Sequence, residues 1–570
     1  MGDTNKRFDE IRDESTDAEK ALIDEYMARR LSRRDFIRRG SMAGMSLPAL
    51  GFIAACGDGD GAEDATTTTE PGDTGTTVGE DTTTTTEAMS DDPITVRIGF
   101  GAPAGVVDPV LINDEGRIQF ISLIADTLTF SSATGLRPAL AESWEPNDDG
   151  TQWTFTLREG AMYNDGTPVT ADDVVATFEG IAGGNAASAL GTGALPPGGT
   201  VAVDERTVQF NLDAPVGAFP YIVSSDNYNA VILPRSYWDS YAEGSYESSF
   251  PGTGPFMVED FTPGQGAVLV RNENYWGPTV VPDRVEVTFF ADDSAMISAF
   301  QEGRLDVIPS FSAANGQALL NDPNVQIGVI ETSEHRQVHM NTQEGLFADK
   351  RVRQALAFAV NRQAMVDGLL ASNGSLGNDH PIATLHPGYD PDAVEQKAED
   401  LDTANALIDE AGVRGAEVTL NALAFEEIEL LAQLIQGAAA QIGITIDIQV
   451  DDAGTYYENY WLDSTLGITN YGHRGVANVF LGAPLRSDGT WNSAKFNNPE
   501  YDALVDAFVA ETDEAAQREL GGQIQALLWD EVPMIIPYFI SNNSATRMGT
   551  TGLETTGMGH VVITELIVGG

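Results

Sequence analysis

The chain has 570 residues, which predicts two or three domains rather than one hydrophobic core. Its 86 acidic and 31 basic residues give a formal net charge of −55, which repels phosphate groups and excludes a nucleic-acid partner. The single cysteine, Cys56, excludes an intrachain disulfide.

The N-terminal segment is typical of an export signal. Residues 32–38 (Ser-Arg-Arg-Asp-Phe-Ile-Arg) are similar to the twin-arginine motif, with Arg33 and Arg34 as the pair. The apolar run at 42–55 is shorter than the ~20 residues of a membrane-spanning helix but suits a signal peptide. It ends in Ala54-Ala55-Cys56, typical of a lipobox. We therefore predict a twin-arginine lipoprotein signal peptide at 1–55 and lipidation of Cys56, rather than a buried helix with an incidental arginine pair.

Residues 56–93 are rich in Gly, Asp, Glu and Thr and hold almost no large apolar side chain. Such a composition buries too little surface to fold, and it predicts a disordered tether. The lipid on Cys56 would then hold the protein on the outer face of the cell membrane, in the periplasm or at the cell surface.

The following body alternates strand and helix patterns, which predicts the α/β class. Period-two alternation predicts strands at 94–100 and 151–158. A strand at 417–423, a helix at 426–441 and a strand at 444–450 form a predicted β-α-β unit with parallel strands. Helical spacing predicts two further helices, at 401–411 and 514–529.

Several sequence blocks have the character of turns and caps. Asp165-Gly166 predicts a turn in which the aspartate accepts local N–H groups and the glycine takes a positive φ. Thr170 is predicted to cap a helix with Asp173 in its first turn. These residues belong to ordered blocks dispersed along the chain: 138–145, 153–160, 164–174, 252–256, 271–277, 347–356 and 532–538.

From Val96 onward these blocks resemble the extracellular solute-binding proteins of family 5, the peptide/nickel-binding family of ABC importers. The resemblance implies a periplasmic-binding-protein-like type II fold, with two lobes joined by a hinge and an inserted smaller domain. Lobe I would comprise residues 94–134, 250–329 and 536–570. The inserted domain would comprise 135–249, and lobe II 330–535.

A search for catalytic and metal sites gives negative predictions. His335 and His339 lie in a strand-like pattern, where four residues span ~13 Å, too far to share a metal ion. The nearest match to a G-x-S-x-G nucleophile motif, residues 373–377, lacks the first glycine and is predicted to lie in a loop. We therefore expect no catalytic residue, no metal and no cofactor.

The family resemblance implies a ligand in the cleft between the lobes. In peptide-binding members, the loop equivalent to 470–475 carries an aspartate that pairs with the ligand's ammonium group, whereas this chain has His473 and Arg474 there. A cleft arginine favours an anionic or strongly hydrogen-bonding solute, and the alternative is that Arg474 pairs with a surface carboxylate. The candidate ligand-binding residues are Tyr471, His473, Arg474, Trp491, Asn227 and Tyr228.

The sequence thus predicts a monomeric substrate-binding lipoprotein of an ABC transporter. It would capture a small polar solute (peptide-like, opine, sugar or another organic solute) and deliver it to the permease subunits in the membrane. The alternatives are a secreted hydrolase on a similar scaffold and a sensory binding protein that does not serve transport.

Overall fold

The computed structural model describes residues 93–103, 107–112, 114–182, 195–241 and 250–569. The predicted signal peptide and most of the tether, with Arg33, Arg34 and Cys56, lie outside the described residues. In the described part, no helix combines the length and the apolar character needed to cross a membrane.

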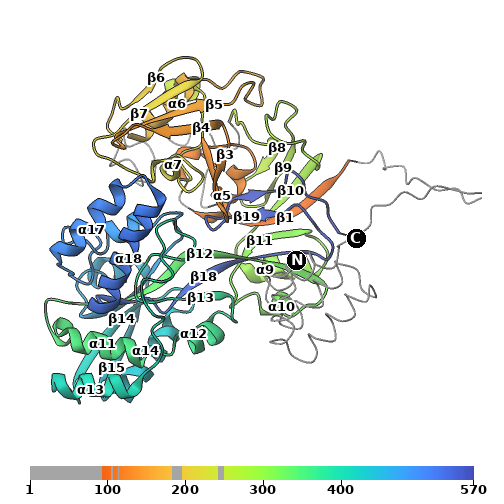
Figure 1. The fold of residues 1–570 in the computed structure, drawn as a ribbon. Coiled ribbons are helices and arrows are strands. Elements are labelled where there is room, and N and C mark those ends of the chain that lie inside the picture. Colours follow the sequence, from red (N-terminus) through yellow and green to blue (C-terminus); the bar gives the residue numbers. More distant parts are fainter. Residues whose placement is uncertain (1–92, 104–106, 113, 183–194, 242–249, 570) are drawn as a thin grey trace, which may run out of the picture. The chain divides into compact units, whose positions relative to one another are not determined.

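A large mixed sheet runs through the described body (Figure 1). The α/β class is confirmed. Along its path the strands follow the order β15 (Thr445–Asp451), β14 (Glu417–Leu423), β16 (Leu466–Tyr471), β12 (Val325–Met340), β18 (Tyr538–Arg547), β11 (Val307–Phe311), β1 (Thr95–Gly101), β10 (Arg284–Phe290), β9 (Gly266–Arg271) and β8 (Phe256–Thr262). Two short strands lie off the path, with β13 (Gly374–Leu376) paired to β18 and β17 (Met534–Ile535) paired to β12.

The predicted β-α-β unit is confirmed. Strands β14 and β15 are parallel, with Glu417 opposite Thr445, and α14 (Ile428–Gln441) connects them. The helix buries Leu431 and Ile435 in the core beneath the sheet. It starts two residues later than the apolar spacing predicted, and this shift leaves Glu426 and Glu427 in the turn after β14. The helices predicted at 401–411 and 514–529 are α13 (Leu401–Ala411) and α18 (Glu514–Glu531).

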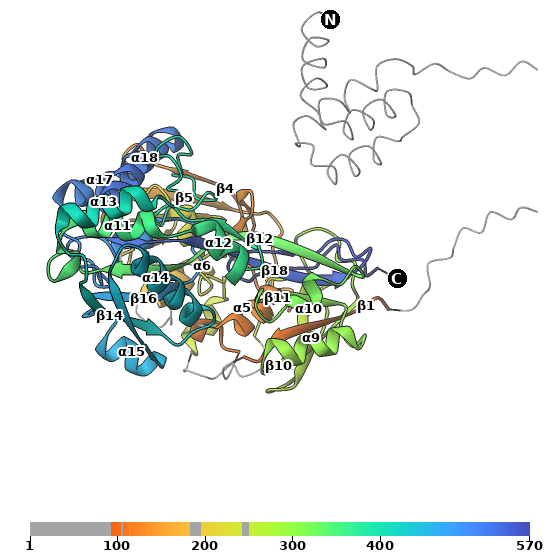
Figure 2. The ribbon, with the colours of Figure 1, turned by 90° about the horizontal axis from the view of Figure 1, so that it is seen from below.

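Two long strands connect separate hydrophobic cores. The C-terminal end of β12 places Val338 and Met340 in the core around β14–β16, whereas its N-terminal end packs beside α9 (Asp293–Gln301) in another core. Strand β18 lies along β12 (Figure 2), and the pairing of the two strands shifts in register between Glu331 and His335. This irregular segment is the feature through which the two halves of the body are joined.

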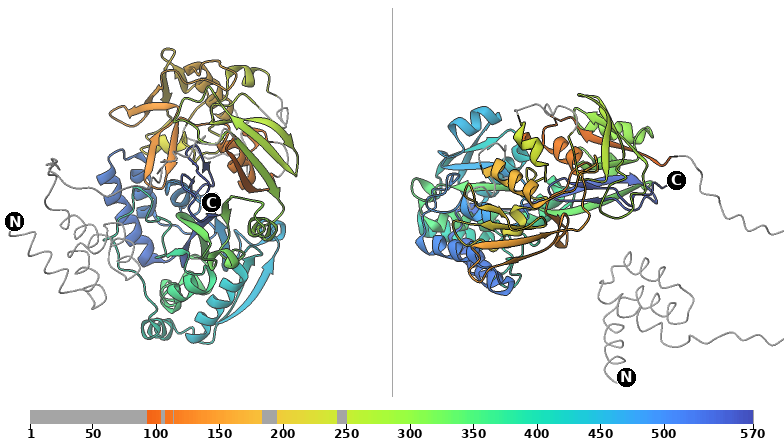
Figure 3. Two further views of the ribbon diagram at one scale, coloured as in Figure 1. Left: turned by 90° about the vertical axis from the view of Figure 1, so that its right-hand side faces the viewer. Right: turned by 90° about the horizontal axis from the view of Figure 1, so that it is seen from above.

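We call the half around β1 and β8–β11 the first lobe and the half around β14–β16 the second lobe. Figures 1 and 3 show the helices of the second lobe gathered about its strands. They include α11 (Lys350–Ala359), α13, α14, α17 (Pro499–Ala510) and α18.

A separate four-stranded sheet lies within the segment predicted as the inserted domain, and we keep that name for it. Its strands follow the order β4 (Ala141–Pro146), β5 (Gln152–Leu157), β7 (Thr207–Asn211) and β6 (Thr200–Ala202). Aromatic side chains fill its core, with the rings of Phe155 and Phe210 edge to face at 5.4 Å.

The predicted turn and helix cap are both present in this domain. The backbone N–H of Thr167 donates to the Asp165 carboxylate at 2.9 Å, and Gly166 has φ +85°. The N–H and the hydroxyl of Thr170 each donate to Asp173 at 2.8 Å, at the start of α6 (Ala171–Gly180). This reciprocal capping satisfies donors that the first helical turn leaves unpaired.

The prediction that residues 373–377 lie in a loop was wrong in part. Gly374–Leu376 form β13, antiparallel to β18, with Ser375 opposite Phe539. A three-residue strand is too short to show an alternating pattern, and here the backbone pairing with β18 decides its conformation.

A buried ion cluster in the second lobe gives a test of its stability. The Asp379 carboxylate is fully buried and accepts hydrogen bonds from Arg362 at 2.6 and 2.8 Å and from Lys397 at 2.9 Å. We expect Asp379→Asn to lower the free energy of unfolding by about 3–5 kcal/mol, because two buried cations lose their counter-charge. Urea unfolding measures this loss. The exposed Asp392→Asn should change stability by less than about 0.5 kcal/mol, and equal losses in the two variants would contradict the prediction.

Candidate functional site

A cavity of about 600 Å³ lies where the two lobes meet, beside the irregular segment of β12. We call it the cleft cavity. Its lining comes from both lobes, from the loop at 472–474 and from Tyr228 of the inserted domain. The charged residues that line it are Asp114, Glu115, Asp293, Glu334, Glu426, Glu427 and Arg474.

One wall is organised by a buried arginine. The Arg336 side chain on β12 has no exposed surface, and its Nη1 donates to Glu334 at 2.9 Å. Its Nε contacts Glu427 at 2.8 Å, its Nη2 donates to Glu426, and the Tyr538 hydroxyl donates to Glu427 at 2.9 Å. Burial alone would lower the pKa of Arg336, but the three carboxylates raise it. Three carboxylates share one guanidinium, so this wall keeps an excess of negative charge.

Glu426 is held in an unusual backbone conformation. Its φ of +44° lies in the left-handed region, which residues with a side chain rarely adopt. Desolvation raises the pKa of its carboxyl to about 7, with Glu334 and Glu427 adding to the effect and Arg336 opposing it. A cation in the cavity would favour the ionised form of this carboxyl.

The opposite wall is also acidic. Glu115 begins α5 (Glu115–Ser122) and accepts a hydrogen bond from Gln119 at 3.0 Å. Desolvation raises the pKa of Glu115, and the negative charges of Asp293 and Glu334 raise it further. The exposed surface of the Glu115 side chain lines the cleft cavity.

The loop after β16 is tied to the irregular segment of β12. The N–H of Ser333 donates to Nδ1 of His473 at 3.1 Å, and its hydroxyl donates to the carbonyl of Arg474 at 2.7 Å. Burial lowers the pKa of His473 to about 3, so the ring is neutral at physiological pH. Nη1 of Arg474 donates to the His473 carbonyl at 2.6 Å, and no carboxylate among the described residues lies within ion-pair distance of Arg474.

The inserted domain touches this loop. The Asp226 carboxylate lies so close to Gly475 that a Cβ atom there would come within 1.6 Å of its oxygen, so a larger residue at 475 would displace this carboxylate. Desolvation raises the pKa of Asp226 to about 6, with Ser131 and Arg474 opposing the shift. Asp226 thus contacts the loop after β16, and Tyr228 lines the cleft cavity.

The six residues predicted from the sequence fall into two groups. Tyr228, His473 and Arg474 line the cleft cavity. Tyr471 and Trp491 lie outside its lining and pack together at 6.3 Å, and Tyr471 also stacks on His335 at 5.5 Å. Asn227 also lies outside the lining, and its amide donates to the carbonyl of Ile222 at 3.0 Å.

The acidic residues of the cavity were not predicted from the sequence. One signal pointed to two of them, because Glu426 and Glu427 follow the C-terminal end of a parallel strand, where ligands bind in α/β folds. The helical pattern of the following residues concealed that signal, since it extended the predicted helix over Glu426.

The sequence profile of the bacterial extracellular solute-binding proteins, family 5, matches residues 135–479, more than half of the chain. The chain belongs to this family. It is therefore an extracytoplasmic solute-binding protein of the kind that serves ABC importers.

Individual relatives agree with this assignment. Heme-binding protein A of Haemophilus influenzae is 26% identical over 469 residues, which cover 77% of this chain and 84% of that protein. The periplasmic murein peptide-binding protein MppA of Escherichia coli is 26% identical over 465 residues, covering 76% of this chain and 86% of that protein. The ABC transporter substrate-binding protein CtaP of Listeria monocytogenes has the same fold, with a TM-score of 0.75 at 21% identity, over 84% of this chain and 99% of CtaP.

The histidines of this family 5 protein give a test of its pH dependence. His339 is buried on β12, and burial together with the charge of Lys495 lowers its pKa from 6.5 to about 3. Below pH 6.5 the unfolded chain binds a proton at His339 that the folded chain does not, so acidification destabilises the fold by about 1.4 kcal/mol per pH unit for this residue.

We expect His339→Leu to remove this contribution. The stability of the variant relative to the parent should rise by about 1.4 kcal/mol per pH unit between pH 6 and pH 4, measured by urea unfolding. Met340→Leu, on the same strand, is the matched control and should show no such trend. If the difference in the free energy of unfolding between His339→Leu and the parent does not change with pH, His339 takes up a proton equally in the folded and unfolded states.

Proposed function

We propose that the cleft cavity binds the transported solute and that this solute carries at least one cationic group. The observation that supports the proposal is the charge of the lining. Six carboxylates line the cavity. Among the described residues of the lining, Arg474 is the single lysine or arginine. In this proposal the protein acts by binding alone and passes its solute to a permease.

Repulsion between the walls supports a cationic solute. Glu115 belongs to the first lobe and Glu334 to the strand that leads into the second, and the charge of Glu334 raises the pKa of Glu115. Two unit charges 4 Å apart interact by about 4 kcal/mol at the effective dielectric of a protein surface. Repulsion between the carboxylates therefore opposes an approach of the two walls over an empty cavity. A cation bound between the walls is attracted by both and favours that approach.

Arg474 adds a second requirement. Its guanidinium has no ion-pair partner among the described residues, and it lines the same cavity as the carboxylates. We propose that it takes a carboxylate or another strong acceptor of the solute, and that Tyr228 and His473 contact the solute beside it. The best match is a zwitterion, with an amine towards Glu334 and Glu426 and an acidic group towards Arg474. Peptide-like and opine-like solutes have this chemistry, and one relative is named for a murein peptide.

Charge-neutral variants test this proposal. We expect the tripeptide Lys-Ala-Ala to raise the melting temperature of the parent protein, whereas its N-acetylated, Nε-acetylated form should not. A ligand at a hundredfold excess over Kd stabilises the folded form by about 2.7 kcal/mol. Glu426→Gln should weaken binding at least tenfold in isothermal titration, because one carboxylate of the cationic subsite is lost.

The matched control is Glu429→Gln, an exposed change at the start of α14. It should bind Lys-Ala-Ala like the parent. Tighter binding of the acetylated peptide than of Lys-Ala-Ala, or parental affinity in Glu426→Gln, would refute a cationic subsite at this wall.

We further propose that the protein is a monomer exported through the twin-arginine route and anchored by a lipid on Cys56. The support is the order of the motifs, with Arg33-Arg34 before a short apolar run that ends at a small-residue lipobox. The lobe boundaries inferred from the family resemblance belong to the same proposal.

Fractionation of cells tests the anchor and the route together. We expect Cys56→Ala to leave the folded protein outside the cytoplasm but release it from the membrane, because the diacylglycerol anchor is lost. Replacement of Arg33 and Arg34 by Lys should instead leave unprocessed precursor in the cytoplasm. Membrane retention of Cys56→Ala, or normal export of the double-lysine variant, would overturn the corresponding assignment.

A further inference from the structure

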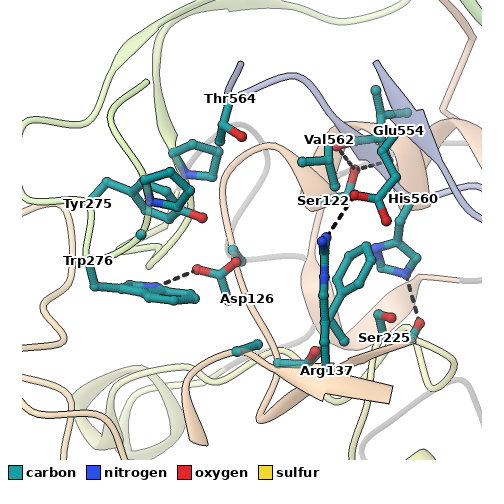
Figure 4. A pocket seen from close by; sticks show the side chains of 18 of the residues that line it. Ser122, Asp126, Arg137, Ser225, Tyr275, Trp276, Glu554, His560, Val562 and Thr564 are labelled. Atoms are coloured by element: carbon teal, nitrogen blue, oxygen red, sulfur yellow. Dashed lines mark hydrogen bonds and ion pairs between the residues drawn. The ribbon is translucent and has the colours of Figure 1, made fainter. Parts of the chain in front are cut away.

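A second cavity, of about 550 Å³, shares no lining residue with the cleft cavity (Figure 4). We call it the lateral cavity. Its walls come from the first lobe, the inserted domain and the C-terminal segment, and none of its lining residues falls between 279 and 551. The second lobe therefore contributes none of the described residues that line it.

Two guanidinium groups in this cavity lie on aromatic rings. Cζ of Arg158 is 4.7 Å from the ring centroid of Trp276, and Cζ of Arg137 is 4.3 Å from that of Phe130. Such stacking fixes the plane of a guanidinium and leaves its N–H groups free to donate at the edge. Two positioned cations in one cavity are unusual in a chain of net charge −55.

The two arginines differ in their partners. Arg137 donates to Glu554 at 2.9 Å, and both side chains are partly exposed. Nε of Arg158 donates to the Ala139 carbonyl at 3.2 Å, and the described residues provide no carboxylate within ion-pair distance of this guanidinium. Arg158 is thus a positioned cation with no counter-ion in the described part of the chain.

The other polar groups leave that charge available. Nε1 of Trp276 donates to the Asp126 carboxylate at 2.9 Å, as Figure 4 shows. Desolvation raises the pKa of Asp126 to about 7, so this carboxyl is partly protonated at neutral pH. Desolvation also raises the pKa of Tyr275, so its phenol stays a donor. The positive charges of Arg137 and Arg158 oppose this rise in pKa. The remaining acidic residue of the lining, Glu565, is exposed.

We propose that the lateral cavity is a second ligand site, which binds a small organic carboxylate with an aromatic or apolar body. The carboxylate would accept from Arg158 and from the Tyr275 hydroxyl, because both are donors of one cavity. The body would lie against Phe130, Val231 and Val561, which supply apolar lining. This ligand differs in charge from the cleft solute, and its site is complete without the second lobe.

Fluorine NMR with 4-fluorobenzoate as the probe tests the site on the full chain. We expect the parent protein to broaden and shift the fluorine signal, and 4-fluorobenzyl alcohol, which lacks the carboxylate, to stay unaffected. Arg158→Gln should weaken binding of the probe at least tenfold, because the charged pair is lost. Tyr275→Phe should weaken binding of the probe several-fold, because one donor is lost while the ring is kept. If Arg158→Gln does not fold, Tyr275→Phe tests the proposal in its place.

The control separates this site from the cleft. Glu426→Gln should bind 4-fluorobenzoate with parental affinity, whatever its effect on Lys-Ala-Ala. The proposal is overturned by a parent protein that does not bind the probe or by unchanged binding in a folded Arg158→Gln. A displacement of the probe by Lys-Ala-Ala would also overturn it, because it would place the probe in the cleft.

Discussion

The wall of the cleft cavity that carries Glu334, Glu426 and Glu427 depends on one buried guanidinium. Arg336 has no contact with solvent, and a buried charge without partners costs several kcal/mol. Its partners come from two distant places, Glu334 on the same strand and the Glu426-Glu427 turn some ninety residues later. The need to neutralise Arg336 therefore fixes the β14–α14 turn against β12 and holds Glu426 at a positive φ.

This constraint acts at an irregular part of the sheet. Beside Arg336, the pairing of β12 with β18 is interrupted between Glu331 and His335, and Ser333 in that gap binds the loop of His473 and Arg474. The same few residues of β12 thus carry a carboxylate wall on one side and anchor a cationic loop on the other. Because β12 also runs into the first lobe, a change of charge in the cavity acts directly on the strand that joins the lobes.

The sequence predicted the regular parts of the fold because their causes are local. Alternation over 417–423 and 444–450 with a helical repeat between them sufficed for the β-α-β unit, and Thr170 with Asp173 sufficed for a helix cap. The irregular strand segment and β13 were not predicted, because their conformations depend on pairing with β18, which lies far away in the sequence.

The site was predicted only in part, for an electrostatic reason. In a chain with 86 acidic residues a carboxylate is the least informative residue, so Glu115, Glu334 and Glu426 carried no signal. Arginine is scarcer, and the reasoning that singled out Arg474 led to a residue of the cavity lining. The aromatic residues Tyr471 and Trp491 were chosen as ligand contacts, but their rings pack against each other, tilted at 6.3 Å. Aromatic rings near a cleft serve the core as readily as the ligand, and only the fold decides between the two.

The two cavities show how local charge departs from the average of the chain. A net charge of −55 surrounds the whole protein with a negative potential, which attracts cations without selecting among them. Selection needs fixed groups in a desolvated place, where an interaction is several times stronger than at the surface. The cleft cavity concentrates the prevailing sign around Arg336, whereas the lateral cavity holds a local exception to it in Arg158, stacked on Trp276. In both places an aromatic or carboxylate partner holds an arginine still, and the difference lies in whether the arginine is neutralised. Arg336 is neutralised more than fully and leaves a negative wall, whereas Arg158 has no counter-ion among the described residues and is a local positive charge.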